Sequence, residues 1–193
     1  YKHIFGLIFV VFLVNLAGQA PPTIWTYYTM LKFNWTPGWV GASLAFVGLT
    51  IGLVQGGLIR IVIPKLGAVK AIYIGLILSL AGYILFAFAT TGWMMFAFMI
   101  PFALGGLAMP AIQGEIANQV PANEQGEMQG TITSLISLTA IIGPLLMTEL
   151  FYNFTKTTGQ IYFPGAPWIM AGILILLSII VCMKSLSKAL TAK

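Results

Sequence analysis

Apolar residues fill the chain in six long runs, which short polar or proline-containing segments separate. Within the runs apolar side chains occur on every face, so the pattern shows neither the alternation of a strand nor the single apolar stripe of a soluble helix. A helix needs about 20 mostly apolar residues to cross a bilayer. The pattern predicts six transmembrane helices, with the approximate bounds 4–31, 38–63, 69–89, 92–117, 127–153 and 165–185.

Composition narrows the class of protein further. Of the 193 residues, 59% are hydrophobic and 7% are charged, whereas a soluble domain carries roughly a quarter charged residues. Such a chain cannot build a water-facing surface, so lipid must cover most of its exterior. The net charge of +5 then belongs to the loops, and no nucleic-acid partner is expected. We therefore expect an all-α membrane protein.

The positions of the basic residues predict the orientation. If the chain starts in the cytoplasm, seven of the nine Lys and Arg side chains lie at cytoplasmic ends of the predicted spans. Cytoplasmic loops carry an excess of these residues, so both termini are expected in the cytoplasm. The chain opens on Tyr1 without a methionine, and the first span begins almost at once. We therefore expect a piece of a longer protein.

Small residues predict where helices approach closely. Gly48 and Gly52 stand one turn apart in the second span, with Gly41 and Gly56 in the same row, so another backbone is expected against them. Similar rows occur in the third and fourth spans: Ala71, Gly75, Ser79, Gly106, Pro110 and Gly114. These rows are either plain packing surfaces or sliding surfaces in a protein that rocks between two states.

Prolines predict interruptions within three of the spans. Pro21 and Pro22 fall in the first span, Pro101 and Pro110 in the fourth, and Pro144 in the fifth. Each proline removes a backbone donor and frees a carbonyl, which is tolerated at membrane depth where the broken helix lines a cavity. Spans one, four and five are therefore expected to line a substrate path, with spans three and six as lipid-facing supports.

Polar, aromatic and thioether side chains on the broken spans are the candidates for contact with a substrate. The set is Asn15, Gln19, Trp25, Phe98, Phe102, Met109, Gln113 and Ser137. Asn15 and Gln19 lie one turn apart, and their amides could instead bond between helices. Gln113, like Gln55, could serve a gate or plain packing, and Ser137 could bond back to its own helix. Three tryptophans at span ends are expected in the interfacial belt: Trp39, Trp93 and Trp168.

Two acids lie inside the predicted spans beyond their first residue, Glu115 and Glu149. An ionised carboxylate in hydrocarbon is costly, so each is expected to be paired, wetted or protonated. A proton carrier has the same requirement, which makes both residues candidates for proton coupling, although either could simply reach headgroup water. Metal-ligand clusters, phosphate-binding loops and nucleophile constellations are absent from the sequence. We expect no enzymatic activity and no cofactor or metal.

A weak internal repeat accompanies the span count. A displacement of 89 residues pairs Gly41 with Gly130, Leu49 with Leu138 and Thr50 with Thr139. Together with six spans, it predicts a three-plus-three arrangement of inverted repeats, which is typical of secondary transporters.

One segment carries a resemblance to a known family. Residues 110–148, PAIQGEIANQVPANEQGEMQGTITSLISLTAIIGPLLMT, resemble the tenth and eleventh spans of the tetracycline-efflux family of the major facilitator superfamily. The stretch from Gly18 to Pro21, followed by Trp25, is similar to that family's seventh span, and GYILFAFATTGW at residues 82–93 to its ninth. The similarity covers essentially the whole chain. It implies the carboxyl-terminal six helices of a twelve-helix drug/proton antiporter, multi-pass in a bacterial inner membrane.

The resemblance also implies partners and roles. The expected partners are the lipid bilayer, the amino-terminal six-helix half, a small-molecule substrate and protons, with the proton gradient as the energy source. Ser79 stands where the family places a membrane-embedded Asp, so tetracycline is one candidate substrate among amphipathic drugs. Arg60 and Lys65, in the loop that matches the superfamily's inter-helix motif, are expected to latch helix ends. The full set of candidate gating residues is Pro21, Gly48, Gly52, Arg60, Lys65, Gly106 and Pro144.

Three functions compete at this point. The first is proton-coupled export by alternating access of two six-helix halves. The alternative is a six-helix membrane scaffold or assembly module without transport activity of its own. A channel is the third, and the absence of a charged ring or a repeated filter loop in the sequence disfavours it.

Overall fold

The computed structural model describes residues 2–156 and 161–190, and within these ranges every regular element is helical. In chain order the elements are α1 (Lys2–Ala17), α2 (Ala20–Phe33), α3 (Pro37–Leu53), the π-helical turn η1 (Val54–Leu58), α4 (Ile59–Leu66), α5 (Ala68–Phe88), α6 (Gly92–Gly105), α7 (Ala108–Gln119), α8 (Gln125–Thr155) and α9 (Ala166–Leu190).

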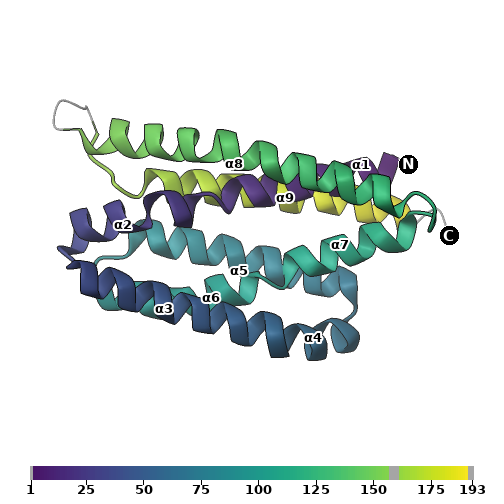
Figure 1. Ribbon diagram of the computed structural model, residues 1–193, viewed down its shortest axis with the longest axis horizontal. Coiled ribbons are helices and arrows are strands. Elements are labelled where there is room, and N and C mark those ends of the chain that lie inside the picture. The colour runs from purple at the N-terminus through teal and green to yellow at the C-terminus, as the bar shows by residue number, and fades with distance from the viewer. Residues whose placement is uncertain (1, 157–160, 191–193) are drawn as a thin grey trace.

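Six helical stretches of the described chain are long and apolar enough to cross a membrane, as the sequence predicted. They are Ile4–Phe33, Pro37–Leu66, Ala68–Phe88, Gly92–Gln119, Gln125–Thr155 and Ala166–Leu186. The stretches run side by side and alternate in direction, so that α1 begins and α9 ends at the same end of the bundle (Figure 1). The all-α, six-span prediction is confirmed.

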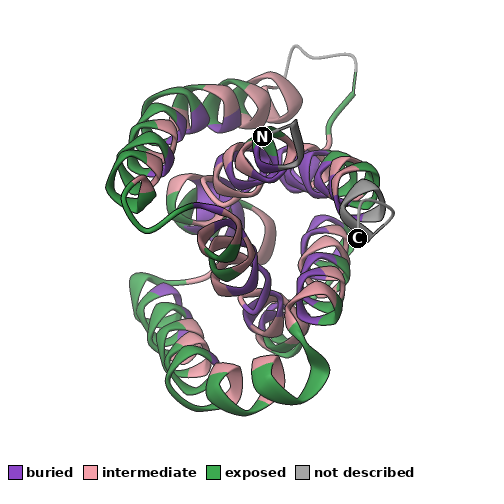
Figure 2. Ribbon diagram, turned by 90° about the vertical axis from the view of Figure 1, so that its right-hand side faces the viewer, coloured by how far each residue is buried: buried purple, intermediate pink, exposed green. Residues whose placement is uncertain are grey.

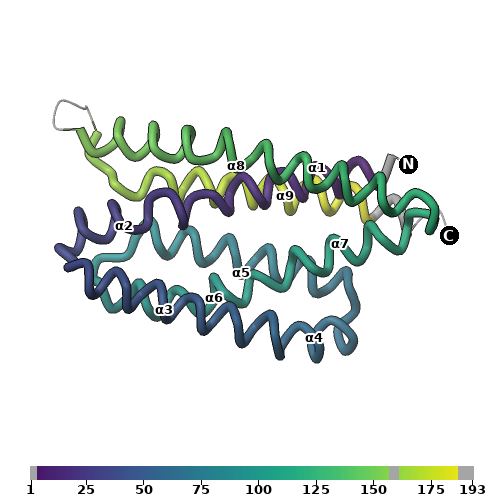
Figure 3. The backbone as a smooth tube through the Cα atoms, viewed as in Figure 1, coloured from purple at the N-terminus to yellow at the C-terminus, as the bar shows by residue number. Residues whose placement is uncertain are grey.

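The first and fourth spans are each interrupted part-way along, where α1 gives way to α2 and α6 to α7 (Figure 3). α1 ends at Ala17, four residues before Pro21, and α6 gives way to α7 around Gly106, four residues before Pro110. In an α-helix the N–H of residue i bonds to the carbonyl of residue i−4, so each proline leaves that carbonyl without its donor. The prediction of breaks in spans one and four is confirmed, but the breaks lie one turn ahead of Pro21 and Pro110, and Pro101 stays inside α6 without interrupting it.

The second and fifth spans depart from the expected pattern. Pro144 does not end a helix, because α8 continues through it for 31 residues. The second span instead contains the unpredicted turn η1, where the helix widens to i→i+5 hydrogen bonding. Gly56 and Gly57 lie in this turn, and their lack of side chains eases the wider backbone path.

α5 packs directly against the backbone of the fourth span. A Cβ atom added to Gly75 would lie 2.5 Å from the Ala108 nitrogen, and one added to Gly82 would lie 2.9 Å from the Cα of Phe102. Side chains at these two glycines are therefore excluded by backbone, which confirms the small-residue row of the third span. Gly114 of the fourth span, by contrast, is not at a close helix contact, because a Cβ there would meet no atom of the described chain within 4 Å.

Buried residues gather toward the middle of the bundle (Figure 2), and the first, third, fourth and sixth spans contribute most of them. In each of these, 44% of the most apolar 18-residue window is buried, against 22% in the fifth span and 6% in the second. α5 buries Ile72 and Phe86 while Ile77 and Phe88 remain exposed. The expectation that spans three and six are lipid-facing supports is therefore half right, because each has one exposed face and one face at the centre of the bundle.

The glycine row of the second span faces away from the rest of the chain. A Cβ atom at Gly41, Gly48, Gly52 or Gly56 would meet no described atom within 4 Å. The close backbone predicted against Gly48 and Gly52 is thus not supplied by the described residues. The row lies on the peripheral span that buries least of its apolar surface.

Candidate functional site

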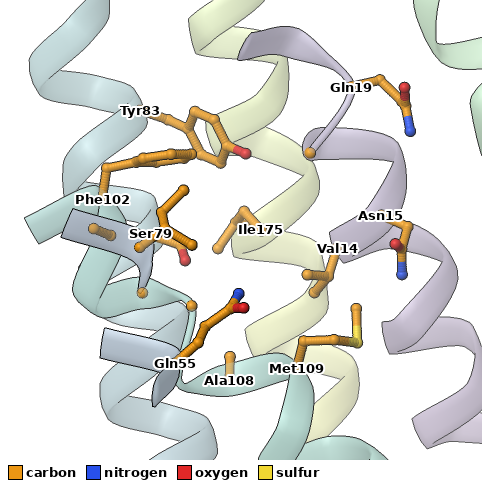
Figure 4. A pocket seen from close by; sticks show the side chains of 15 residues that line it. Val14, Asn15, Gln19, Gln55, Ser79, Tyr83, Phe102, Ala108, Met109 and Ile175 are labelled. Atoms are coloured by element: carbon orange, nitrogen blue, oxygen red, sulfur yellow. The ribbon is translucent and has the colours of Figure 1, made fainter. Parts of the chain in front are cut away.

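A cavity of about 260 Å³ lies where the two broken spans meet the π-helical turn of the second span. Figure 4 shows the lining side chains of α1, η1, α5, α6, α7 and α9 around it, with Gln55 reaching inward and Gln19 turned away. Its polar lining residues are Asn15, Gln19, Gln55, Ser79 and Tyr83. Its larger apolar lining residues are Val14, Ile51, Phe102, Met109 and Ile175. The breaks predicted from the prolines therefore do border a cavity.

An apolar cavity of about 330 Å³ adjoins the first one. The two share Gly18, Ile51 and Phe102 as lining residues. The second cavity continues along α2 past Pro21 and Pro22 to Trp25 and Phe86, and α3 closes it with Leu44 and Val47. A hydrogen-bonding compartment and an apolar compartment thus lie next to each other, an arrangement that suits an amphipathic small molecule.

Tyr83 repairs the break in the first span. The Ala17 carbonyl lacks its helical donor because Pro21 has no N–H, and the Tyr83 hydroxyl donates a hydrogen bond to this carbonyl at 3.2 Å. Tyr83 is buried in α5, and its ring packs edge-on against Phe102 with centroids 5.4 Å apart. Sequence reasoning missed this residue, because its partner lies 66 positions away in the chain.

The amides around the break play different parts. The Asn15 side-chain nitrogen donates to the Val11 carbonyl at 2.8 Å, so Asn15 bonds within its own helix and not between helices. Gln19 borders the cavity but turns toward α8, and a Cβ on Gly143 would overlap its side chain. Gln55 extends from η1 into the cavity (Figure 4), which makes it the most direct amide contact for a bound molecule.

Trp25 lines the apolar cavity and also connects α2 to α3. Its indole N–H donates to the Ser43 hydroxyl of α3 at 2.9 Å, and the side chain is 5% exposed. Its ring meets Phe86 and Trp168 edge-on, with centroids 5.4 and 5.9 Å apart. Its polar atom is already used, so Trp25 offers a substrate only the apolar part of its ring.

The prediction for Trp168 is wrong. It was expected in the interfacial belt, yet it is fully buried at the start of α9 among Trp25, Tyr28 and Phe86. Its position at a span end resembles that of a belt residue, and only the inward direction of its side chain distinguishes it. Trp39 and Trp93, by contrast, are 46% and 72% exposed, as belt residues are.

Three predicted substrate contacts do not line either cavity. Phe98 packs against the buried core one turn before Phe102 in α6. Gln113 lies one turn beyond Met109 in α7 and outside both linings. The Ser137 hydroxyl donates to the Thr133 carbonyl at 3.0 Å, so it bonds back to its own helix, which was the alternative expected for it.

Neither predicted proton-coupling acid reaches the cavities, whose linings contain no charged side chain. Glu115 is half-buried and accepts a hydrogen bond from the Gln119 amide at 2.9 Å. Glu149 is exposed near the far end of α8 and accepts one from the Asn153 amide at 2.7 Å. Both carboxylates are therefore paired within their own helices.

The candidate gating residues fall into two groups. Pro21 lines the apolar cavity and Gly106 lines the polar one, while Pro144 follows the glycine that Gln19 contacts. Arg60 and Lys65 are exposed on α4, and among the described residues neither has an acidic partner. The predicted latch is therefore not formed in this conformation.

Comparison with known proteins gives a family and its relatives. The sequence profile of the Major Facilitator Superfamily matches residues 7–189. The class G tetracycline resistance protein of Vibrio anguillarum is 38% identical over 173 residues, which is 89% of this chain and 43% of the relative. The class C protein of Escherichia coli is 36% identical over 183 residues, 95% of this chain and 44% of the relative. The class E protein of Escherichia coli is 38% identical over 173 residues, 89% and 42% respectively. The chain thus spans less than half the length of these curated relatives.

Proposed function

The chain belongs to the major facilitator superfamily, and on that premise we propose that it is the carboxyl-terminal half of a secondary active transporter. The transporter exports an amphipathic small molecule in exchange for protons, by alternating access of two six-helix halves. The proton gradient is its energy source, and it needs no cofactor. Relatives described as tetracycline resistance proteins support a tetracycline-like compound as one candidate substrate. The protein is multi-pass in the inner membrane, with both termini in the cytoplasm.

The observation that carries this proposal is the pair of adjoining cavities at the helix breaks. Hydrogen-bonding groups of Gln55, Ser79 and Asn15 border the first cavity, and aromatic rings border the second. Both linings lack charged side chains, so this half recognises its substrate by hydrogen bonds, stacking and apolar contact. The charged contacts that a proton antiporter needs must then come largely from elsewhere in the protein.

The exposed faces of spans two and five support an amino-terminal partner half. Leu49, Leu53, Ile141 and Leu145 are each at least 66% exposed on these spans. Beside the two leucines, Gly48 and Gly52 leave room for close approach of another backbone. Docking of a second six-helix unit on this side would cover the faces and enclose the cavities between the halves.

Of the two acids, Glu115 is the better candidate for a share in proton handling. It lies six residues after the cavity-lining Met109 on α7, about 9 Å further along the helix at 1.5 Å per residue. It is half-buried, whereas Glu149 is exposed. A half-buried carboxylate changes its hydration readily when helices move, which is how protonation becomes linked to a change of state.

The test is efflux from cells that express the complete protein. Cells loaded with a fluorescent tetracycline should lose it faster than control cells, and an uncoupler that collapses the proton gradient should abolish the difference. Efflux that persists unchanged after collapse contradicts proton coupling. The scaffold alternative is favoured if the six-helix unit folds normally with or without the amino-terminal half and no transport is detected in either case.

A further inference from the structure

A second aromatic hollow lies at the end of the bundle opposite the start of α1 and the end of α9 (Figure 1). Its volume is about 240 Å³, and its lining residues are Trp35, Trp39, Gly92, Trp93 and Phe96. We call it the tryptophan pocket. It shares no lining residue with the two cavities of the candidate transport site, and its four rings are not needed for the proposed transport.

The rings of the tryptophan pocket come from three segments; Trp39 meets its neighbours at steep angles, whereas Trp35 and Trp93 are each tilted 39° from Phe96. Trp39, at the start of α3, crosses Trp93 of α6 at 77° with centroids 5.6 Å apart. It crosses Phe96 at 75° and 6.4 Å. Trp35, in the loop after α2, completes the wall with its centroid 5.5 Å from that of Phe96. Belt tryptophans on separate helices do not need such a concave arrangement.

Gly92 allows the Trp35 ring to take this place. A Cβ atom at Gly92 would lie 3.0 Å from Cε2 and 3.2 Å from Cζ2 of the Trp35 indole. Any side chain at this position would therefore push the ring away. The absence of a side chain lets the indole lie against the backbone at the start of α6 and form one side of the hollow.

The pocket is open and its polar atoms are unused. Trp39 is 46% exposed and Trp93 is 72% exposed. The indole N–H of Trp25 is bonded to Ser43, but no acceptor among residues 2–156 and 161–190 engages those of Trp35, Trp39 and Trp93. These three indole N–H groups therefore have no hydrogen-bond partner in the described part of the chain.

The chemistry of the lining selects one class of cation. The faces of aromatic rings attract a cation within about 6 Å of the ring centroid, and aromatic cages recognise quaternary ammonium groups in this way. A primary ammonium also needs hydrogen-bond acceptors, and the tryptophan pocket contains no carboxylate. The Lys32 ammonium, near the end of α2, donates instead to the Tyr28 hydroxyl and the Ala87 carbonyl, at 2.9 and 3.3 Å. None of these three residues lines the tryptophan pocket.

We propose that the tryptophan pocket binds a quaternary ammonium group. The cation lies against the faces of Trp35, Trp39 and Trp93, and the free indole N–H groups donate to an oxygen atom of the same molecule. A choline-type lipid head group and a free organic cation share this chemistry. The site does not depend on the transport mechanism proposed above.

Fluorine NMR of the complete protein, labelled with 5-fluorotryptophan, tests the proposal. The resonances of Trp39 and Trp93 are assigned by their loss in Trp39→Phe and Trp93→Phe. Titration with choline should shift them saturably, whereas 3,3-dimethylbutan-1-ol, its uncharged isostere, should not. The Trp25 resonance, which belongs to a buried ring outside the pocket, should stay in place.

Substitutions at exposed aromatic positions provide the matched comparison. Trp93→Leu should weaken choline binding about 3- to 30-fold, and Trp93→Phe should weaken it less because an aromatic face remains. Tyr27→Leu, which removes a 66% exposed ring that does not line the pocket, should leave binding unchanged. Equal shifts with the uncharged isostere, shifts of every tryptophan, or no shift at 100-fold excess choline would each overturn the proposal.

The lipid environment identifies the source of the ligand. Nanodiscs of phosphatidylcholine and of phosphatidylglycerol are compared without added choline. Shifted Trp39 and Trp93 resonances in phosphatidylcholine alone support the proposal with the head group as ligand. If the resonances are the same in the two lipids and then shift when choline is added, the proposal is supported with a free cation as ligand.

Discussion

At the scale of single residues, the broken first span shows how a proline acts at a distance. Pro21 removes the donor of the Ala17 carbonyl, and the Tyr83 hydroxyl of α5 replaces it. The break therefore persists at membrane depth without an unpaired carbonyl, which would be costly there. It also leaves Gly18 on the wall of both cavities.

Removing the Tyr83 hydroxyl should destabilise this break. Tyr83→Phe keeps the ring against Phe102 but loses the bond to Ala17, so we expect a loss of about 1 kcal/mol in the free energy of unfolding. Steric trapping in bicelles measures it. Tyr27→Phe removes an exposed hydroxyl for which no bond is found in the described chain and should change stability little. Equal losses in both variants would contradict the role of Tyr83.

The two acids should separate in a coupling assay. Glu115→Gln should lower proton-driven uptake into everted vesicles about a hundredfold or more, the size of effect typical of losing a proton-transferring group. Substrate exchange that needs no gradient should remain. Glu149→Gln removes an exposed carboxylate and should retain both activities. Normal proton-driven uptake by Glu115→Gln would exclude this acid as a carrier.

At the scale of elements, backbone contact between α5 and the fourth span fixes the core. Gly75, Gly82 and Gly105 each oppose backbone atoms across this interface. Small residues permit such proximity, and dispersion contacts then hold helices together where lipid removes the hydrophobic drive. The cavity lies along the same interface, since Ser79 and Gly105 line it.

Adding one methyl group should test this packing. Gly75→Ala would place a Cβ 2.5 Å from the Ala108 nitrogen, and overpacking of this kind costs about 1–3 kcal/mol. Thermal unfolding in detergent should show the loss. Gly114→Ala is the matched control, because a Cβ there meets no described atom and alanine favours the helix by up to about 1 kcal/mol. If Gly75→Ala is as stable as the control, the helices can move apart at little cost and the close packing at Gly75 is not essential.

At the scale of the whole molecule, burial is uneven across the six spans. The second and fifth spans leave most of their apolar surface uncovered by the rest of the chain. The second also carries the open glycine row. This asymmetry supports the proposal that a partner unit docks on one side.

Filling the glycine row should disturb assembly more than folding. In Gly48→Leu the new side chain has room within the described chain, so the six helices should fold as before. Copurification of this half with a separately expressed amino-terminal half should fall about tenfold, because overpacking costs about 1–3 kcal/mol and each 1.4 kcal/mol is a factor of about ten. Efflux should fall with it. Phe5→Leu, at an exposed position on α1, serves as control. Unchanged copurification of the Gly48 variant would place the partner elsewhere.

The apolar pattern alone was enough to predict the spans, because membrane insertion depends on the length of an apolar run and its lack of charge, and both are local properties of the sequence. The family resemblance and the presence of breaks one turn ahead of Pro21 and Pro110 followed from local residues as well. Which side chains face inward depended on tertiary packing. Trp168, Tyr83 and Gln55 have their roles because helices distant in sequence meet at those residues. In an all-apolar helix, composition is similar on every face, so only contact with neighbouring helices distinguishes a core residue from a lipid-facing one.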